Sequence, residues 1–442
     1  MMPAPLLDLW QGLSPLTQDA VLLGALLLPA LVVGLVVLWG FRPYPIVAAM
    51  LWRFRLTNLL FVLIIAASVG IGVGLIAQER GLRQGTAQAA DKFDLIIAAP
   101  GSEITAMLAA VYLQPADMPL VSGAVFDEVA NDPRVAIAAP IAFGDSVDGA
   151  PVVGTSPQFV AHLAGPLAQG RVFETAREAV AGARVGLALG DRFEPAHGLG
   201  HDTEGEGAHA GEEFRIVGRM APTGSPWDRA VLVPAEAVWQ VHGLAPGHGA
   251  DWDGRVGPPY AADHFPGTPA ILVRAEQLWA NYALRSQFTR ADAMAFFPGA
   301  VLAQLHGLLG DVRQAMSALA ILTEILVTAG VLTGLLVLTR LYAQRLALLR
   351  ALGAPGRFVF AVVWSYAATL IVAGALLGVA VGYAATAAIS QVLSARTDIL
   401  VGATLGWPEA QLVAAFVSLT ILIAMIPAAV TLTRDVVADL RG

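Results

Sequence analysis

The sequence contains no cysteine, a single lysine and few charged residues. Of its 442 residues, 14% are charged, whereas about 25% is usual for a soluble domain. Without cysteine, no disulfide framework, thiolate metal site or thiol chemistry is available. The lysine, Lys92, lies between Asp91 and Phe93, so it cannot be the lysine of a Gly-Lys-Ser/Thr phosphate-binding loop. Any ATP energy must therefore come from another subunit.

Other absences narrow the class of protein further. The sequence has no His-Glu-x-x-His motif, which would indicate a zinc hydrolase. It also has no Gly-x-Ser-x-Gly motif, which would indicate a serine hydrolase. Ser102 and Ser225 lie beside glycines, but no partner base can be assigned to them. The net charge is −8, and no basic tract or patch interleaved with aromatic residues predicts nucleic-acid binding.

Long apolar runs are the main positive feature, since 56% of the residues are hydrophobic. A helix needs about 20 apolar residues to cross the hydrocarbon core. Five segments meet this requirement: 20–40, 57–77, 317–339, 358–390 and 410–433. The first has no basic residue before it and no small-x-small cleavage site after it, so we interpret it as a retained helix; a signal anchor or cleaved signal is the alternative.

Arginines predict the orientation of these helices. They gather between the first and second segments, between the third and fourth, and after the fifth, at Arg42, Arg53, Arg55, Arg340, Arg345, Arg350, Arg357, Arg434 and Arg441. By the positive-inside rule these regions are cytoplasmic, which places the N-terminus and the long segment between the second and third helices outside.

The central part of the chain predicts an extracytoplasmic α+β domain. Short apolar or alternating runs predict strands at 93–99, 135–140, 151–154, 213–218, 229–234 and 270–274. Helices are expected at 104–114, 122–130, 235–242 and 275–287, and 78–92 and 300–316 could extend the adjoining membrane helices as paired stalks. The predicted fold class is an α-helical integral membrane protein with about five transmembrane helices and this domain inserted between helices two and three.

These expectations divide the chain as follows: extracytoplasmic N-terminus 1–19, extra membrane helix 20–40, cytoplasmic amphipathic segment 41–56, membrane helix 57–77, α+β domain with stalks 78–316, membrane helix 317–339, cytoplasmic helix 340–357, membrane helix 358–390, periplasmic loop 391–409, membrane helix 410–433 and cytoplasmic tail 434–442. Segment 44–56 is expected to lie at the membrane surface, with a plain extension of the following helix as the alternative.

Two features of the membrane segments carry candidate functions. Gly374, Gly378 and Gly382 recur every four residues, a spacing that allows close helix packing at a dimer or helix-pair interface; glycine is also common in membrane helices generally. Glu324 lies inside the third segment, where an acidic residue is a candidate for function, although a carboxylate in the outer part of the helix can reach interfacial water.

The most informative cytoplasmic loop is Arg345-Leu-Ala-Leu-Leu-Arg350-Ala-Leu-Gly353-Ala-Pro355. It predicts a short, basic, amphipathic helix that ends at Gly353 and Pro355. A soluble partner in the cytoplasm could push on such a helix. The alternative is an ordinary basic loop that only fixes the orientation of its neighbours.

The order of these features resembles the ABC-transporter permeases of the macrolide-exporter, cell-division and lipoprotein-release systems, the MacB, FtsX and LolC type. Leu348-Leu-Arg350-Ala-Leu-Gly353-Ala is similar to the family's segment between its second and third membrane helices. Segments 152–159, 170–173, 214–218 and 223–234 follow the family's order in the insert. The family commonly has an acidic residue at the position of Arg345 and four membrane helices, so segment 20–40 is additional.

The resemblance implies a non-catalytic permease subunit in a homodimer or heterodimer, bound to ABC ATPase subunits that hold ATP and Mg²⁺. It implies a multi-pass protein of the bacterial inner membrane with its large domain in the periplasm. ATP hydrolysis would drive export, extraction or mechanotransmission, with a periplasmic adaptor or lipoprotein as a further partner. The residues expected to couple to the ATPase are Arg345, Leu349, Arg350, Leu352 and Gly353. The substrate cannot be inferred.

Histidines suggest a second possibility. His197, His201 and His209 lie among acidic residues, and imidazoles with carboxylates suit Zn²⁺ or another divalent metal. A second group contains His242, His248, Asp251, Asp253 and His264. The alternative for the first group is a solvated glycine-rich loop without a metal. The competing function is therefore a membrane-anchored, metal-responsive binding or scaffold protein without an ATPase. A secondary transporter is disfavoured because no paired intramembrane charges or inverted repeats are evident.

Overall fold

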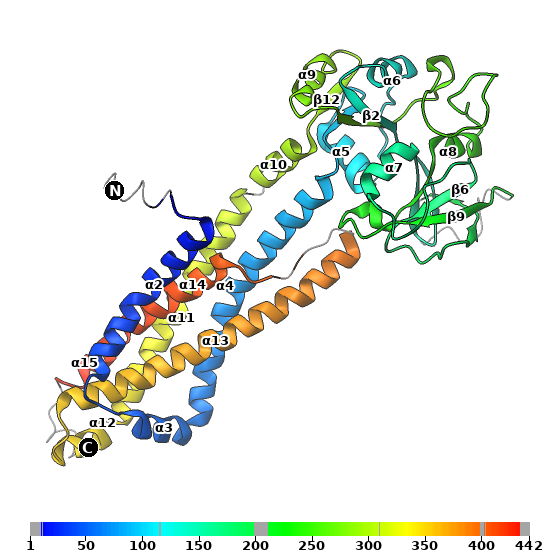
Figure 1. Cartoon of the computed structure of the whole chain (residues 1–442). Helices are drawn as coiled ribbons and strands as arrows, with labels where there is room; N and C mark the ends of the chain where they lie inside the picture. The colour runs from blue at the N-terminus through cyan, green and yellow to red at the C-terminus, as the bar shows by residue number, and fades with distance from the viewer. Residues whose placement is uncertain are drawn as a thin grey trace. The chain divides into compact units, whose positions relative to one another are not determined.

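The structure, a computed structural model, describes residues 10, 12–114, 116–198, 211–308, 310–397, 402 and 404–433 (Figure 1). The predicted cytoplasmic tail 434–442 lies outside this range. The chain divides into two compact units. We call Leu82–Leu309 with Val392–Val401 the insert domain, and Met1–Gly81, Gly310–Gln391 and Gly402–Gly442 the helical unit.

The helical unit is built from these helices: α2 (Pro15–Leu38), α3 (Tyr44–Arg53), α4 (Arg55–Ala90), α11 (Gly310–Leu341), α12 (Ala343–Ala351), α13 (Gly356–Thr397), α14 (Trp407–Ile423) and α15 (Met425–Val430). Helices α4 and α13 extend beyond the limits of the unit.

In the described part of the chain, four helical stretches are long and apolar enough to cross a membrane: Pro15–Leu38, Arg55–Ala90, Gly356–Ser394 and Trp407–Val430. The remaining predicted segment, 317–339, falls within α11, in which Ile321–Gly334 is a shorter apolar stretch by the same criteria.

Local signals explain where the first helices begin and end. The Ser14 hydroxyl accepts a hydrogen bond from the Thr17 amide at 3.3 Å, and Pro15 occupies the first turn, so α2 begins before the apolar segment 20–40. Phe54 leaves helical geometry between α3 and α4, at φ −115° and ψ 37°. Segment 44–53 is therefore a separate helix and not an extension of α4. The guanidinium of Arg55 lies 5.6 Å from the Trp52 ring centre across this break.

Helix α2 runs beside α14 (Figure 1). Buried residues of α4, α13 and α14, including Ile65, Tyr366 and Phe416, form a common apolar core in the helical unit. The Trp364 indole donates to the Ile421 carbonyl at 3.3 Å, and the Tyr366 hydroxyl donates to the Asn58 side chain. These bonds connect α13 to α14 and to α4.

The insert domain contains two sheets. The antiparallel four-stranded sheet has the order β12-β1-β11-β2, with β1 (Leu95–Ala98), β2 (Val135–Pro140), β11 (Ala270–Ala275) and β12 (Met294–Phe296). The mixed eight-stranded sheet has the order β5-β9-β6-β10-β4-β3-β8, and β7 pairs with β9. Its strands are β3 (Ala142–Val147), β4 (Ala150–Thr155), β5 (Gln169–Gly170), β6 (Glu178–Ala181), β7 (Arg192–Phe193), β8 (Ala196–His197), β9 (Phe214–Arg219) and β10 (Val231–Pro234).

Six α-helices and two 3₁₀-helices complete the described part of this domain: α5 (Glu103–Tyr112), α6 (Gly123–Ala130), α7 (Pro157–Ala164), α8 (Ala235–Val241), α9 (Ala280–Gln287), α10 (Pro298–Leu308), η1 (Pro226–Arg229) and η2 (Ala262–His264). The Ser102 hydroxyl caps α5 by accepting a hydrogen bond from the Thr105 amide at 3.3 Å. Thr86 of α4 and His306 of α10 are hydrogen-bonded at 3.3 Å, so the two predicted stalk segments lie side by side within this domain.

All six predicted strands appear, but two boundaries differ. The strand predicted at 229–234 begins at Val231, because Arg229 ends η1. The buried Asp228 carboxylate accepts hydrogen bonds from the amides of Thr223 and Gly224 and closes a tight turn there. Helix α9 begins at Ala280 rather than 275, since β11 continues to Ala275. The result confirms that the central part of the chain folds as an α+β domain.

Candidate functional site

The predicted coupling segment is a helix with a glycine end. In α12 the Gly353 amide donates to the Arg350 carbonyl and the Ala354 amide to the Leu349 carbonyl, both at 3.0 Å. Gly353 has φ 96°, a conformation that strains any residue with a side chain. The glycine therefore ends the helix and turns the chain toward α13.

The side chains of this segment divide into two groups. Leu346 and Ala347 are buried against the core of the helical unit. Leu348 is 53% exposed and Leu352 is 78% exposed, and Arg345 is exposed beside them. Positions 345, 348 and 352 share one face because they follow helical spacing. An exposed arginine with two exposed leucines can contact a protein that offers an acidic and an apolar surface.

The other two predicted coupling residues lie closer to the core. Leu349 packs against the apolar core at half-burial, and the Arg350 guanidinium lies 3.5 Å from the Thr431 carbonyl as a donor. Arg350 thus connects α12 to the chain just after α15.

The three predicted packing glycines lie against α4. A Cβ at Gly374 would lie 2.6 Å from the Ile65 Cβ, and one at Gly378 would lie 2.7 Å from the Val69 Cβ. At Gly382 it would lie 2.8 Å from the carbonyl oxygen of Gly70. Contacts this close require glycine, so this stripe fits a helix pair inside one chain.

An ion pair that the sequence did not reveal fixes the start of α14. The Arg80 guanidinium donates to Glu409 at 2.8 Å and also to the Thr404 carbonyl. Glu409 is 2% exposed and accepts a second hydrogen bond from the Gly406 amide at 2.9 Å. A Cβ at Gly406 would collide with the Arg80 guanidinium, so a side chain there would require Arg80 to move. The one local signal for this site is that Glu409 follows Gly406 by three residues, a spacing typical of the start of a helix.

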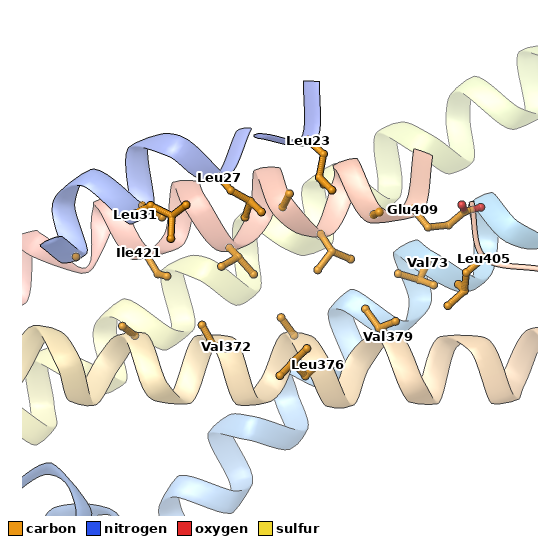
Figure 2. A pocket seen from close by; sticks show the side chains of 18 of the residues that line it. Leu23, Leu27, Leu31, Val73, Val372, Leu376, Val379, Leu405, Glu409 and Ile421 are labelled. Carbon is orange, nitrogen blue, oxygen red and sulfur yellow. The ribbon is translucent and has the colours of Figure 1, made fainter. Parts of the chain in front are cut away.

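Beside this pair lies an apolar cavity of about 720 Å³ in the helical unit. Figure 2 shows leucines and valines of α2 and α13 pointing into it, with Glu409 at one end. The labelled side chains are Leu23, Leu27, Leu31, Val73, Val372, Leu376, Val379, Leu405, Glu409 and Ile421. Because the Glu409 carboxylate is engaged by Arg80, the lining suits a hydrocarbon chain.

Glu324 also lies in the helical unit. One of its carboxylate oxygens is 3.3 Å from where a Cβ at Gly72 of α4 would be. The acid therefore faces α4 at a glycine.

The histidines of the insert domain combine differently from the sequence groups. His197 on β8 and His242 at the end of α8 both face the buried Asp145 on β3. His201 and His209 lie outside the described residues. Asp145, His197 and His242 are the one group of three or more such ligands found among the residues that the structure describes. No local motif pointed to Asp145, because only sheet pairing brings β3 to β8.

His248 of the second histidine group is engaged elsewhere. His248 contacts the buried Glu236 at 3.1 Å and stacks on Trp252. Glu236 also accepts from the Gly257 amide. Burial, with Glu236 close by, raises the pKa of the Tyr260 phenol well above its usual value. This buried network connects α8 to the loop that follows it.

Comparison with known proteins identifies the insert domain. Residues 59–278 match the family model of the MacB-like periplasmic core domain. A crystal structure of the periplasmic region of MacB from Actinobacillus actinomycetemcomitans is 11% identical, with a TM-score of 0.30; the match covers 50% of this chain and 95% of that one. None of the curated proteins compared with the chain matches it. The MacB-like periplasmic core domain, together with the apolar helices and the order of motifs, supports an ABC-transporter permease of the MacB/FtsX/LolC type.

Proposed function

We propose that the chain is the transmembrane permease subunit of an ABC complex in which a separate ATPase subunit binds α12. ATP hydrolysis in that subunit drives export, extraction or mechanotransmission through the insert domain. The observation that carries the proposal is the exposed face of Arg345, Leu348 and Leu352 on a helix whose opposite side is buried. Family membership supports it, because permeases of this type work with an ABC ATPase and are not catalytic themselves.

The proposal includes a location and an assembly. The chain lies in the bacterial inner membrane with its N-terminus and insert domain in the periplasm and α12 in the cytoplasm. It works as a homodimer or heterodimer, with a periplasmic adaptor or lipoprotein as a further partner. ATP and Mg²⁺ are held by the ATPase. Arginines near α12 and α3 support this orientation.

A photocrosslinking experiment tests the proposal. p-Benzoylphenylalanine replaces Leu352 in one variant and Leu278 of the insert domain in the other; these leucines are 78% and 82% exposed. After irradiation of native membranes, we expect an adduct from position 352 with a protein carrying a P-loop, identified by mass spectrometry. Position 278 is the matched control and should give no such adduct. An ATPase adduct from neither position, or equally from both, contradicts the proposal.

The second candidate is a membrane-anchored, metal-responsive binding protein with no ATPase. The cluster of Asp145, His197 and His242 is the observation that favours it. It predicts metal binding together with no P-loop protein crosslinked at position 352. Metal binding together with the crosslink supports the permease.

A further inference from the structure

The insert domain brings two imidazoles and one carboxylate to a single point. The Asp145 Oδ1 atom lies 3.4 Å from the His197 Nδ1 atom and 3.6 Å from the His242 Nε2 atom. The three ligand atoms all lie within 4.8 Å of one another. Tetrahedral zinc with bonds of about 2.0–2.1 Å separates its ligand atoms by roughly 3.4 Å. The distances from Asp145 to His197 and from Asp145 to His242 are close to this separation.

Backbone pairing fixes two of the three side chains. Asp145 and His197 are direct partners in the antiparallel register of β3 and β8. The Gly198 amide donates to the Gly144 carbonyl at 3.1 Å and continues this pairing. Strand β8 is at the edge of the eight-stranded sheet. The imidazole therefore stands beside the carboxylate because of the sheet, not because of a glycine-rich loop.

A hydrogen bond to the Val238 carbonyl determines which ring nitrogen of His242 carries a hydrogen. His242 Nδ1 lies 2.8 Å from the Val238 carbonyl oxygen, which can only accept, so Nδ1 carries the hydrogen. Nε2 is then the ring nitrogen on the Asp145 side that would bind an ion. Metal-bound histidines usually donate their second N–H to a carbonyl or carboxylate in this way.

A glycine makes room for the same imidazole. A Cβ at Gly144 would lie 2.5 Å from His242 Cε1 and 2.6 Å from Nε2. Any side chain at position 144 would therefore displace the ring from Asp145. Asp145 itself is 2% exposed, whereas His242 is 24% and His197 51% exposed, so an ion could enter from the solvent side.

We propose that Asp145, His197 and His242 form a binding site for a divalent transition metal, of which Zn²⁺ fits best. Two imidazoles and a carboxylate suit Zn²⁺, Co²⁺ or Ni²⁺ and disfavour Mg²⁺ and Ca²⁺, which prefer oxygen ligands. Three protein ligands leave a coordination position open to water or a further ligand. The ion would join edge strand β8 to the end of α8. The proposal is independent of the ATPase.

The test uses the full chain in detergent, purified with an affinity tag that contains no histidine and stripped of metal with a chelator. Calorimetric titration with Zn²⁺ is compared for the unmodified chain and for His197→Ala, His242→Ala and Asp145→Asn. We expect each variant to weaken binding at least tenfold. His264→Ala is the matched control and should bind as the unmodified chain does. Loading with Co²⁺ should give the visible absorption of a four-coordinate ion, and the variants should lose it.

The outcomes separate this site from the one predicted along the sequence. Because His197 is half exposed, its replacement should leave the metal-free unfolding temperature unchanged, so lost binding would not reflect lost folding. Zn²⁺ binding that persists in both His197→Ala and His242→Ala overturns the proposal. So does binding that disappears only in the double variant His201→Ala, His209→Ala. No Zn²⁺ binding by the unmodified chain overturns it as well.

Discussion

The helical unit and the insert domain achieve close packing with opposite kinds of residue. In the helical unit, glycines of α13 allow it to pack closely against α4, while Leu31 and Leu35 of α2 are 65% and 63% exposed. In the insert domain large side chains fill the interior, and Trp227 and Phe126 are 0% and 1% exposed. Lipid chains are as apolar as leucine, so burying leucine between membrane helices gains little and close backbone contact gains more. In water, burial of large apolar surface is the main driving force.

Charged groups show the same contrast. The helical unit buries the Glu409 carboxylate beside Arg80, where loss of either partner leaves a charge without compensation. The insert domain also buries carboxylates such as Asp228, but in its Arg171–Glu178 pair the arginine is 45% exposed, so water screens the interaction. Equivalent substitutions should therefore have unequal effects in the two units.

The largest expected effect is a difference in accessibility between the two units. The chain has no cysteine, so Leu352→Cys and Leu278→Cys each introduce a unique thiol. A maleimide that cannot cross membranes should label the Leu278→Cys variant in intact spheroplasts and leave the Leu352→Cys variant unlabelled. Permeabilised cells, in which both should react, provide the control. Labelling of both variants in intact cells contradicts the proposed orientation.

Breaking the buried ion pair should be the most destabilising substitution. Arg80→Ala leaves Glu409 buried without its partner, which we expect to cost about 3 kcal/mol. Thermal unfolding in detergent measures the loss. Arg171→Ala is the matched surface variant and should cost under about 1 kcal/mol. Combining Arg80→Met with Glu409→Gln should recover much of the stability, because no buried charge remains. Equal losses for the two arginine variants would remove the contrast between the units.

The glycine contact should come next. Gly378→Ala places a Cβ 2.7 Å from the Val69 Cβ and 2.9 Å from the Ala66 carbonyl oxygen, so α4 and α13 must separate. We expect a loss of about 1–3 kcal/mol, as for other overpacked sites. Gly330→Ala on α11 is the control, since a Cβ there meets nothing within 4 Å. Equal unfolding temperatures for Gly378→Ala and Gly330→Ala would mean that the glycine contacts do not stabilise the packing of α13 against α4.

The smallest effect concerns Glu178, a partly buried carboxylate of the insert domain that pairs with an exposed arginine. Hydrogen bonds from the Arg171 guanidinium lower the pKa of Glu178 below its usual value. Its contribution to stability is therefore present above the unfolded pKa of about 4.3 and is lost as the pH falls through the lower folded pKa. We expect Glu178→Gln to cost about 0.5–1 kcal/mol at pH 7, because water screens the pair.

Unfolding as a function of pH checks this last prediction. The stability difference between Glu178→Gln and the unmodified chain should shrink as the pH falls below the unfolded pKa of about 4.3, and it should vanish once the pH is below the lowered pKa of the folded state. A difference that stays constant into acid would mean that hydrogen-bond geometry, not charge, stabilises this surface.

Much of the fold was predictable because its signals are local. The strand at 135–140 and the helix at 343–351 follow from runs of apolar residues and from Gly353. Helix α7 was missed although Ser156 caps it and Pro157 opens it, because Pro157 interrupts a run that reads as strand and turn. The short strands β5, β7 and β8 have two residues each and no periodicity to detect.

The sequence by itself determined the apolar helices, the central α+β domain and the short helix ending at Gly353, since these depend on composition and neighbouring residues. The tertiary structure decided which distant residues meet. Sheet pairing brings Asp145 to His197, and helix packing brings Arg80 to Glu409 across more than 300 positions. Such contacts depend on the register of strands and helices, which no local pattern encodes.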